Sequence, residues 1–298
     1  MTTTRPAVAE RMTAGALLIV FAVLAVAVPA RADLADDIRE RIDIALGWLV
    51  PTNYHEDAGF YAPHQPHWFW VFDTVQVVWL LDWLEEQGWD VAEYTDEVEN
   101  ARAFLDDARA EDGSWYWEGP SEIHRDTETT ALASLLAPSP LSDQWIVDHQ
   151  LPDGHWDELA PTVEDQDYPT STGFAMYAAT CRNYDVDFEK AYEWYESRSE
   201  ADWYPSGDFY KTRFYATYLL GSLAKLRDDF PDEARVKLRE IVTYYHDGNG
   251  SFEGRTMDDN PSAIIPVAMA MQTAIQLDDP ALEDEIYLAG VYLRENFA

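Results

Sequence analysis

A seven-residue frame that recurs five times along the chain limits the possible folds more than any other feature of the sequence. Each copy has glycine at the fifth place and an aromatic residue at the seventh, and the clearest copy runs from Gln150 to Trp156. Successive glycines are 54, 41, 53 and 43 residues apart, at Gly59, Gly113, Gly154, Gly207 and Gly250. Self-similarity at this spacing predicts one supersecondary unit that is used repeatedly.

Two kinds of helical pattern alternate between the copies of this frame. One kind has apolar residues at spacings of three and four, typical of helices wetted on one side, over 34–49, 98–108, 188–195, 234–245 and 282–293. The other kind is apolar on nearly every side, typical of buried helices, over 75–81, 131–137, 173–179, 214–224 and 263–274. The alternation predicts an all-α fold, with an inner ring of five buried helices inside an outer ring of about six amphipathic helices.

Two of the repeat copies also resemble motifs of known families. Gln150-Leu-Pro-Asp-Gly-His-Trp156 resembles the QW motif of squalene and oxidosqualene cyclases, and Gly250-Ser-Phe-Glu-Gly-Arg255 is similar to a G-G-F-x-G-R stretch of protein prenyltransferase β-subunits. The resemblance covers nearly all of the chain after residue 32. It implies the α/α-toroid of these families, a closed barrel of inner and outer helices. Such toroids host several chemistries, so function has to be argued from the site.

Residues 1–32 have the order of a secretory signal peptide. Arg5 and Arg11 give a positive start, an uncharged apolar run follows over 14–30, and Ala30-Arg31-Ala32 has the A-x-A form of a cleavage site. We therefore expect cleavage after Ala32, a secreted or cell-surface protein, and one toroid domain over 33–298. The alternative is an uncleaved anchor, although the apolar run is shorter than the about 20 residues of a membrane span.

The charge of the chain is strongly one-sided. Residues 1–32 hold three arginines and one glutamate, so the net charge of −36 becomes −38 once they are removed. Such a surplus of negative charge disfavours a compact state in dilute salt through repulsion, and molar salt screens that repulsion. The composition therefore favours an exported protein of a halophile. It excludes nucleic acid as a partner. We also expect no stable membrane insertion after cleavage, and a single cysteine, Cys181, precludes a disulfide within the chain.

The segment His124–Ala131 is the strongest candidate for chemistry. It resembles the D-x-D-D-T-A motif of class II terpene cyclases, with Asp126 at the first acid, Glu128 at the proton-donating position and Thr129 in place of the last Asp. The resemblance implies Glu128 and Asp126 as catalytic residues that act on an isoprenoid-like ligand. The structural alternative is that Asp126 caps a helix and Glu128 complements its dipole.

Further residues near the repeat turns are predicted to bind the ligand. Asp73 precedes a buried helix, and its spacing from Gln76 is that of a capping box. The tryptophans of the turns either present faces for stacking on sugars or wedge each turn against a helix. The full predicted set is Asp73, His124, Trp115, Trp117, Trp156, Tyr168 and Tyr210.

No cofactor and no metal site is predicted. Prenyltransferases bind zinc through Asp, Cys and His, but the stretch after Arg255 contains no cysteine. Cys181 lies instead in a predicted buried helix, where we expect it to pack. His64 and His67 are spaced like a ligand pair but lack an evident third ligand.

The sequence leaves three functions open. The first is the handling of a small hydrophobic, isoprenoid-like ligand in a central cavity, with or without turnover. The second is a carbohydrate-active enzyme on an α/α barrel that binds an oligosaccharide and uses Asp126 and Glu128 as acid and base. The third is a non-catalytic scaffold or binding toroid.

The acidic composition makes a prediction about stability. Residues 33–298 hold 55 acidic and 17 basic side chains, so screening by salt should stabilise the fold. Thermal melts in dilute buffer and in molar potassium chloride measure this, and we expect the melting temperature to rise with salt. A melting temperature that stays flat or falls would contradict the halophilic interpretation.

Overall fold

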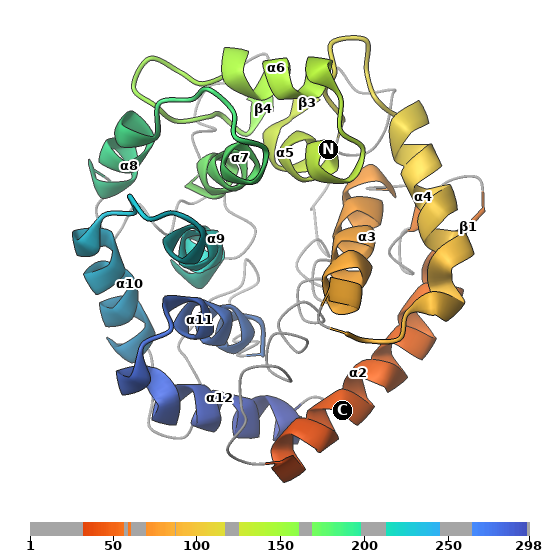
Figure 1. Ribbon diagram of the computed structural model, residues 1–298, viewed down its shortest axis with the longest axis vertical. Helices are drawn as coiled ribbons and strands as arrows, with labels where there is room; N and C mark the ends of the chain where they lie inside the picture. Colours follow the sequence, from red (N-terminus) through yellow and green to blue (C-terminus); the bar gives the residue numbers. More distant parts are fainter. Residues whose placement is uncertain are drawn as a thin grey trace, which may run out of the picture. The chain divides into compact units, whose positions relative to one another are not determined.

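The chain is almost entirely helical in a computed structural model, which describes residues 32–56, 59–60, 70–86, 88–116, 125–160, 169–197, 213–244 and 264–296 (Figure 1). The all-α prediction is therefore confirmed. The chain divides into two compact units, residues 45–199 and residues 1–44 with 200–298. The first helix, α2 (Ala32–Asn53), contains the division between Ile44 and Ala45.

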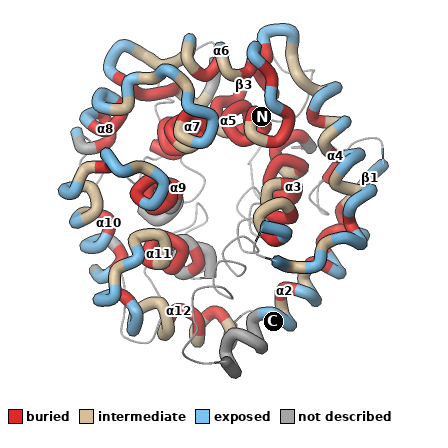
Figure 2. Tube along the Cα trace, viewed as in Figure 1, coloured by how far each residue is buried: buried red, intermediate tan, exposed pale blue. Residues whose placement is uncertain are grey.

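The unit of residues 45–199 has a row of buried helices and a row of partly exposed ones. Helix α5 packs against both α3 and α7, while α4 packs on α3, α6 on α5 and α7, and α8 on α7. Figure 2 shows α5 and α7 buried along most of their length and α4, α6 and α8 exposed on one side. The helices are α3 (Trp70–Glu86), α4 (Thr95–Asp107), α5 (Thr127–Leu136), α6 (Pro140–Asp148), α7 (Pro169–Arg182) and α8 (Phe188–Ser197), with a 3-10 turn η1 (Ala92–Tyr94).

Two short antiparallel ladders complete this unit. Strand β1 (Tyr54–His55) pairs with β2 (Gly59–Phe60), and β3 (Arg125–Asp126) pairs with β4 (Leu159–Ala160). Each strand has two residues, so the ladders fix the turns between helices and form no layer of their own.

The second unit repeats the same arrangement with its own helices. Helices α9 (Arg213–Leu226) and α11 (Ile264–Leu277) pack together, α10 (Asp232–Tyr244) lies against both, and α12 (Glu283–Asn296) lies against α11 after a 3-10 turn, η2 (Pro280–Leu282). A Cβ on Gly221 would come within 3.1 Å of the Cα of Thr273, so the lack of a Cβ at Gly221 permits close approach of α9 and α11. The alternation of buried and amphipathic helices is thus confirmed within each unit.

The repeat frame corresponds to a recurring hydrogen-bonded clip. The backbone N–H of Trp115 donates to Thr130 Oγ1 at 3.0 Å, and that of Trp156 donates to Thr172 Oγ1 at 3.1 Å. The two indole N–H groups donate to the carbonyls of Leu105 and Ile146 at 2.7 and 2.8 Å. Each tryptophan therefore joins the preceding partly exposed (outer) helix to the following buried (inner) helix, which confirms the predicted repeat for these copies.

The first copy makes the same clip with a shifted register. Its bond is made by Phe60, whose N–H donates to Thr74 Oγ1 at 2.8 Å. Phe60 directly follows Gly59, whereas the other clips use the residue two places after glycine, so the predicted frame is displaced by one residue here. The copies around Gly207 and Gly250 lie outside the described residues.

Glycine is required in the turns because the turn touches the next outer helix. Gly113 and Gly154 have φ of +92° and +100°. A Cβ on Gly113 would lie 2.5 Å from the backbone nitrogen of Ser142 in α6, and one on Gly154 would lie 2.5 Å from that of Ala191 in α8. Each turn consequently holds three helices together: the outer helix before it, the inner helix after it and the next outer helix.

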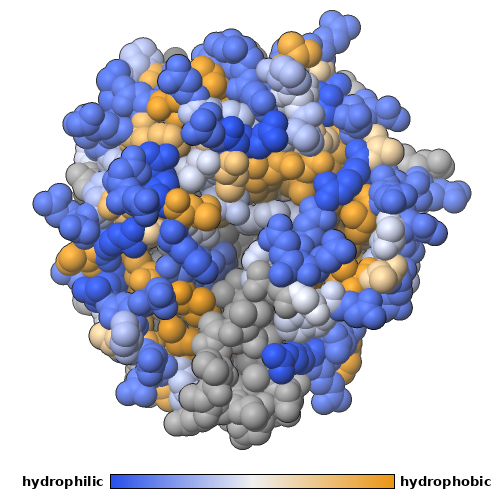
Figure 3. Space-filling view, in the orientation of Figure 1, coloured by the Kyte–Doolittle hydropathy of each residue, from blue (hydrophilic) through white to orange (hydrophobic). Residues whose placement is uncertain are grey.

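Acidic side chains gather on the exposed faces of the outer helices, in keeping with the predicted surface. Hydrophilic residues dominate the described part of the face in Figure 3. The exposed acids of α4, α8 and α10 include Asp96, Glu99, Asp106, Asp107, Glu189, Glu193, Asp232, Glu233 and Glu240. Among the described residues, no helix is both long and apolar enough to span a membrane.

Two predictions about individual residues were wrong. Helix α3 begins at Trp70, so Asp73 lies inside its first turn and does not cap it. The reason is that the apolar residues Val71 and Phe72 join the buried helix, which moves its start upstream. Cys181 is exposed near the end of α7, where the helix leaves the core, and it does not pack as expected.

The turn geometry predicts unequal costs for two glycine substitutions. Gly88 has φ of +85° but open space around it, so Gly88→Ala should cost about 1–2 kcal/mol for the left-handed backbone alone. Gly154→Ala carries that cost and the clash with α8, which adds about 1–3 kcal/mol. Denaturant unfolding in molar salt measures both variants. Equal losses would show that the turn does not need close contact with α8.

Candidate functional site

Asp126 lies where the extended strand β3 turns into helix α5. Its φ and ψ are −102° and 125°, and its carboxylate accepts a hydrogen bond from the backbone N–H of Thr129 at 2.6 Å. This is N-cap geometry, so the capping prediction for Asp126 is confirmed. The residue is only 4% exposed, which is unusual for an N-cap acid and calls for a further explanation.

Burial changes the acidity of this carboxyl group. It raises the pKa of Asp126 from 3.8 to about 6, while the hydroxyl and backbone N–H of Thr129 favour the anion and offset part of the rise. A group with this pKa exchanges a proton near neutral pH, which is the property needed for general acid–base chemistry. The capping role and a chemical role are therefore compatible at this position.

Two successive repeat turns hold the start of α5 in place. From the turn before it, the carbonyl of Trp115 accepts the N–H of Asp126 at 3.1 Å. From the turn after it, the carbonyl of Glu158 accepts the N–H of Thr127 at 2.8 Å, and the carbonyl of Asp157 accepts its hydroxyl at 2.5 Å. Asp126 is thus positioned by backbone contacts from both sides.

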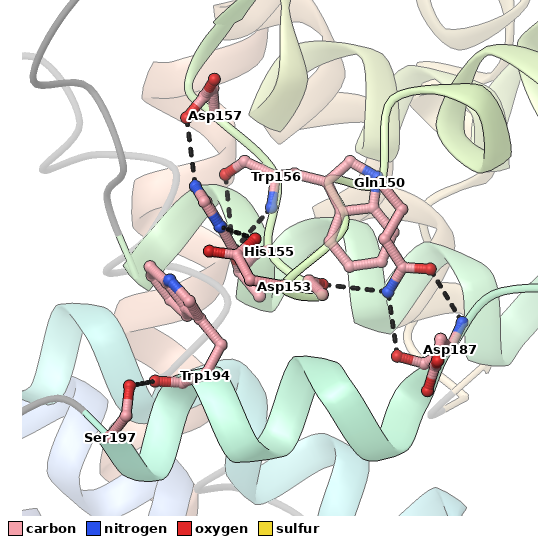
Figure 4. Close-up of polar contacts among 10 residues, drawn as sticks. Gln150, Asp153, His155, Trp156, Asp157, Asp187, Trp194 and Ser197 are labelled. Carbon is pink, nitrogen blue, oxygen red and sulfur yellow. Dashed lines mark hydrogen bonds and ion pairs between the residues drawn. The ribbon is translucent and has the colours of Figure 1, made fainter.

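The turn that supplies Asp157 is itself fixed by a buried histidine (Figure 4). The ring nitrogens of His155 lie 2.7 Å from Asp153 Oδ1 and 3.2 Å from Asp157 Oδ1. The ring also stacks on Trp194 of α8, with centroids 4.7 Å apart and planes 12° from parallel, and only 7% of the residue is exposed.

Gln150 closes the other side of the same turn (Figure 4). Its amide nitrogen donates to the carbonyls of Gly154 and Asp187, both at 2.9 Å, and its oxygen accepts the N–H of Asp187 at 2.8 Å. The glutamine at the first place of the repeat frame therefore links its own turn to the residue before α8. Together with His155 it makes this copy the most strongly cross-linked turn among those described.

The other predicted catalytic residue, Glu128, lies in the first turn of α5 and is half-buried. The helix dipole favours its anionic form there. Asp73 is also half-buried, in the first turn of α3, the helix that packs beside α5. The structure thus brings Asp126 and Glu128 to one helix start and places Asp73 on the neighbouring helix.

The tryptophans predicted to bind ligand need a correction. Trp115 and Trp156 are completely buried, so neither ring has a face on which a sugar or lipid could stack. The wedge interpretation describes both, because each indole fills the space between its turn and two helices. Four further predicted residues, Trp117, His124, Tyr168 and Tyr210, lie outside the described residues.

Three threonines that recur in the clips were not predicted from the sequence as functional residues. Thr74, Thr130 and Thr172 make the clips, 14, 15 and 16 residues after their aromatic partners. The signal in the sequence was a threonine at nearly the same distance after the aromatic residue of each turn. Within the part of the chain that the structure describes, no group of three His, Cys, Asp or Glu side chains is arranged to hold a metal ion.

Comparison with known proteins leaves the site to be argued from its own residues. The sequence matches no protein-family model and no curated protein.

The raised pKa of Asp126 predicts a specific pH dependence of stability. As the pH rises from about 4 to 6, the unfolded chain loses this proton before the folded chain does, so the folded state loses stability. The loss should be on the order of 3 kcal/mol. Asn at this position keeps the cap but does not titrate, so Asp126→Asn should remove that part of the decline. Unfolding of both proteins across this range measures it, and parallel pH profiles would contradict a buried, protonated Asp126.

Proposed function

We propose that the helix pairs of the two units form one α/α-toroid and that this toroid binds an isoprenoid-like ligand on the inner side of α3, α5 and α7. The proposal is supported by the alternation of buried and amphipathic helices in both units and by the recurring clip. The resemblance of Gln150–Trp156 to the QW motif points to the same architecture.

One observation carries the chemical part of the proposal: a buried carboxyl group, with a pKa near 6, caps an inner helix within the segment that resembles D-x-D-D-T-A. The resemblance implies Glu128 as the proton donor. The two environments favour the opposite division, because burial raises the pKa of Asp126 to about 6 while the helix dipole favours the anionic form of Glu128. We therefore assign proton donation to Asp126, with Glu128 as the anion beside it.

The acidity of Asp126 also bears on what it protonates. A carboxyl group with a raised pKa is a weaker acid, and a bare alkene is a very poor base. Protonation of an oxygen atom on the ligand suits such a group better. The proposed reaction is therefore acid catalysis at an oxygen substituent of a hydrophobic ligand.

A carbohydrate-active enzyme is the second candidate, and the same pair of carboxyl groups favours it. An acid with a raised pKa beside an ionised carboxylate is the arrangement by which glycosidases divide the roles of acid and nucleophile or base. The two candidates differ in the ligand and share Asp126 as the acid.

The assay is product formation from a panel of polyprenyl compounds and a panel of oligosaccharides, both in molar salt. If Asp126 donates the proton, Asp126→Asn should lower turnover by a factor of about 10² or more while ligand binding persists. Glu128→Gln should have a smaller effect. The control is Asp96→Asn, which changes an exposed first-turn acid on the outer helix α4.

Each outcome decides between the candidates. Polyprenyl turnover that survives in the Asp126→Asn protein would overturn its role as donor. Turnover confined to the oligosaccharides would favour the second candidate. If the protein neither binds nor turns over any compound of the two panels, it is a scaffold and the proposal is overturned.

A further inference from the structure

Among the described residues of α3, α5 and α7, three buried polar groups have no hydrogen-bond partner. They are Nε2 of Gln76 on α3, Oγ1 of Thr129 on α5 and Oγ of Ser171 on α7. Gln76 is 8% exposed, and Thr129 and Ser171 are completely buried. A buried group without a partner destabilises the folded state, so such groups call for an explanation.

Several other buried hydroxyls of these helices do have partners. The clip threonines, Thr130 and Thr172, accept the backbone N–H groups of the turns. Ser134 of α5 donates to the carbonyl of Ala131 at 2.7 Å. Gln76, Thr129 and Ser171 differ from these residues in having no partner.

The register of the clips shows which way the side chains of Gln76 and Ser171 face. Each clip threonine points toward a turn of the outer layer, and successive helical residues are rotated by about 100°. Ser171 precedes the clip residue Thr172 by one place, and Gln76 follows the clip residue Thr74 by two. Viewed along its helix, Ser171 is therefore rotated by about 100° and Gln76 by about 160° from the clip residue. The two rotations have the same direction and turn both side chains away from the outer helices.

Helix α5 lies between α3 and α7, so Asp126 caps the helix that separates Gln76 from Ser171. The residue of α5 that corresponds to Ser171 is Thr129, whose backbone N–H bonds to Asp126 and whose hydroxyl also has no partner. The start of α5 and the inward faces of its two neighbours thus present an amide donor, a hydroxyl and a carboxyl group.

The charges of the described residues around these groups disfavour an anionic ligand. Helices α3 and α5 contain no Lys or Arg, and α7 contains only Arg182, in its last turn. Arg125 precedes Asp126, but its guanidinium pairs with Asp112 at 3.2 Å and lies over the ring of Tyr116 at 3.9 Å. A diphosphate or carboxylate would meet Asp126 and Glu128, and the described parts of α3, α5 and α7 offer no cation at their starts to neutralise it.

We infer that the ligand carries an uncharged hydroxyl group, which accepts a hydrogen bond from Gln76 and exchanges one with Ser171. This inference rests on the proposed function and specifies its ligand as an isoprenoid alcohol. An alcohol oxygen can bond to both Gln76 and Ser171, whereas a hydrocarbon can bond to neither.

The test compares a polyprenyl alcohol with the hydrocarbon and the diphosphate of the same chain length, by equilibrium binding in molar potassium chloride. The wild-type protein should bind the alcohol about tenfold tighter than either of the others, because desolvation of the hydroxyl group offsets part of the gain from its hydrogen bonds to Gln76 and Ser171. Ser171→Ala and Gln76→Leu should each reduce the affinity for the alcohol to near that for the hydrocarbon. Both variants should melt at the wild-type temperature or higher, because each removes an unsatisfied group.

Ser134→Ala is the matched control, since it removes a buried hydroxyl of α5 that already has a partner. It should lower the melting temperature and leave the preference for the alcohol unchanged. A preference that survives in Ser171→Ala and Gln76→Leu, or a diphosphate that binds best, would overturn the inference.

Failure of the inference can be told apart from failure of the proposed function. Isoprenoid binding that ignores the head group would keep the function and overturn the inference. Binding of oligosaccharides alone, weakened by Ser171→Ala, would overturn the isoprenoid function and keep the hydroxyl site. No binding of any of these compounds would overturn both.

Discussion

The hydrogen bond between an aromatic residue of a turn and a threonine of the next inner helix organises each described repeat. It is found at Phe60, Trp115 and Trp156. One backbone N–H and one hydroxyl bring the start of a buried helix against a turn, and the indole then ties the later turns to the preceding outer helix. The glycine allows the following outer helix to approach the turn. Because every contact involves neighbouring elements, the arrangement can be extended one helix pair at a time.

The candidate acid is a consequence of this turn geometry. Asp126 would be an ordinary exposed cap if α5 began at a free loop. Instead the carbonyl of Trp115 holds it from one side, and the turn at Asp157 and Glu158 holds the residue after it from the other. These contacts bury the carboxyl group and raise its pKa. The same scaffold contacts that stabilise the repeat therefore prepare a group for proton transfer.

Three of the described arginines lie at the opposite ends of the inner helices. Arg102 donates to the carbonyl of Leu136 at 2.8 Å and Arg109 to that of Ala137 at 2.9 Å, both at the end of α5. Arg235 donates likewise to the carbonyl of Ala224 near the end of α9. Cations at helix ends complement the dipole. The first turns of α3 and α5 contain Asp73 and Glu128, and the first turn of α7 contains no charged residue. This asymmetry underlies the inference of an uncharged ligand group.

The sequence by itself determined the helices, their alternation and the turn glycines, because periodicity and left-handed turn geometry are local properties. It also placed Asp126 at a helix start, since a cap depends only on residues three apart. Tertiary structure decided what local patterns cannot encode. The burial of Asp126, the missing partners of Ser171 and Gln76, and the burial of Trp115 and Trp156 all depend on which helix packs against which. Desolvation is set by neighbours that are distant along the chain, so the acidity and the free hydrogen-bonding capacity of the site emerged only in the folded protein.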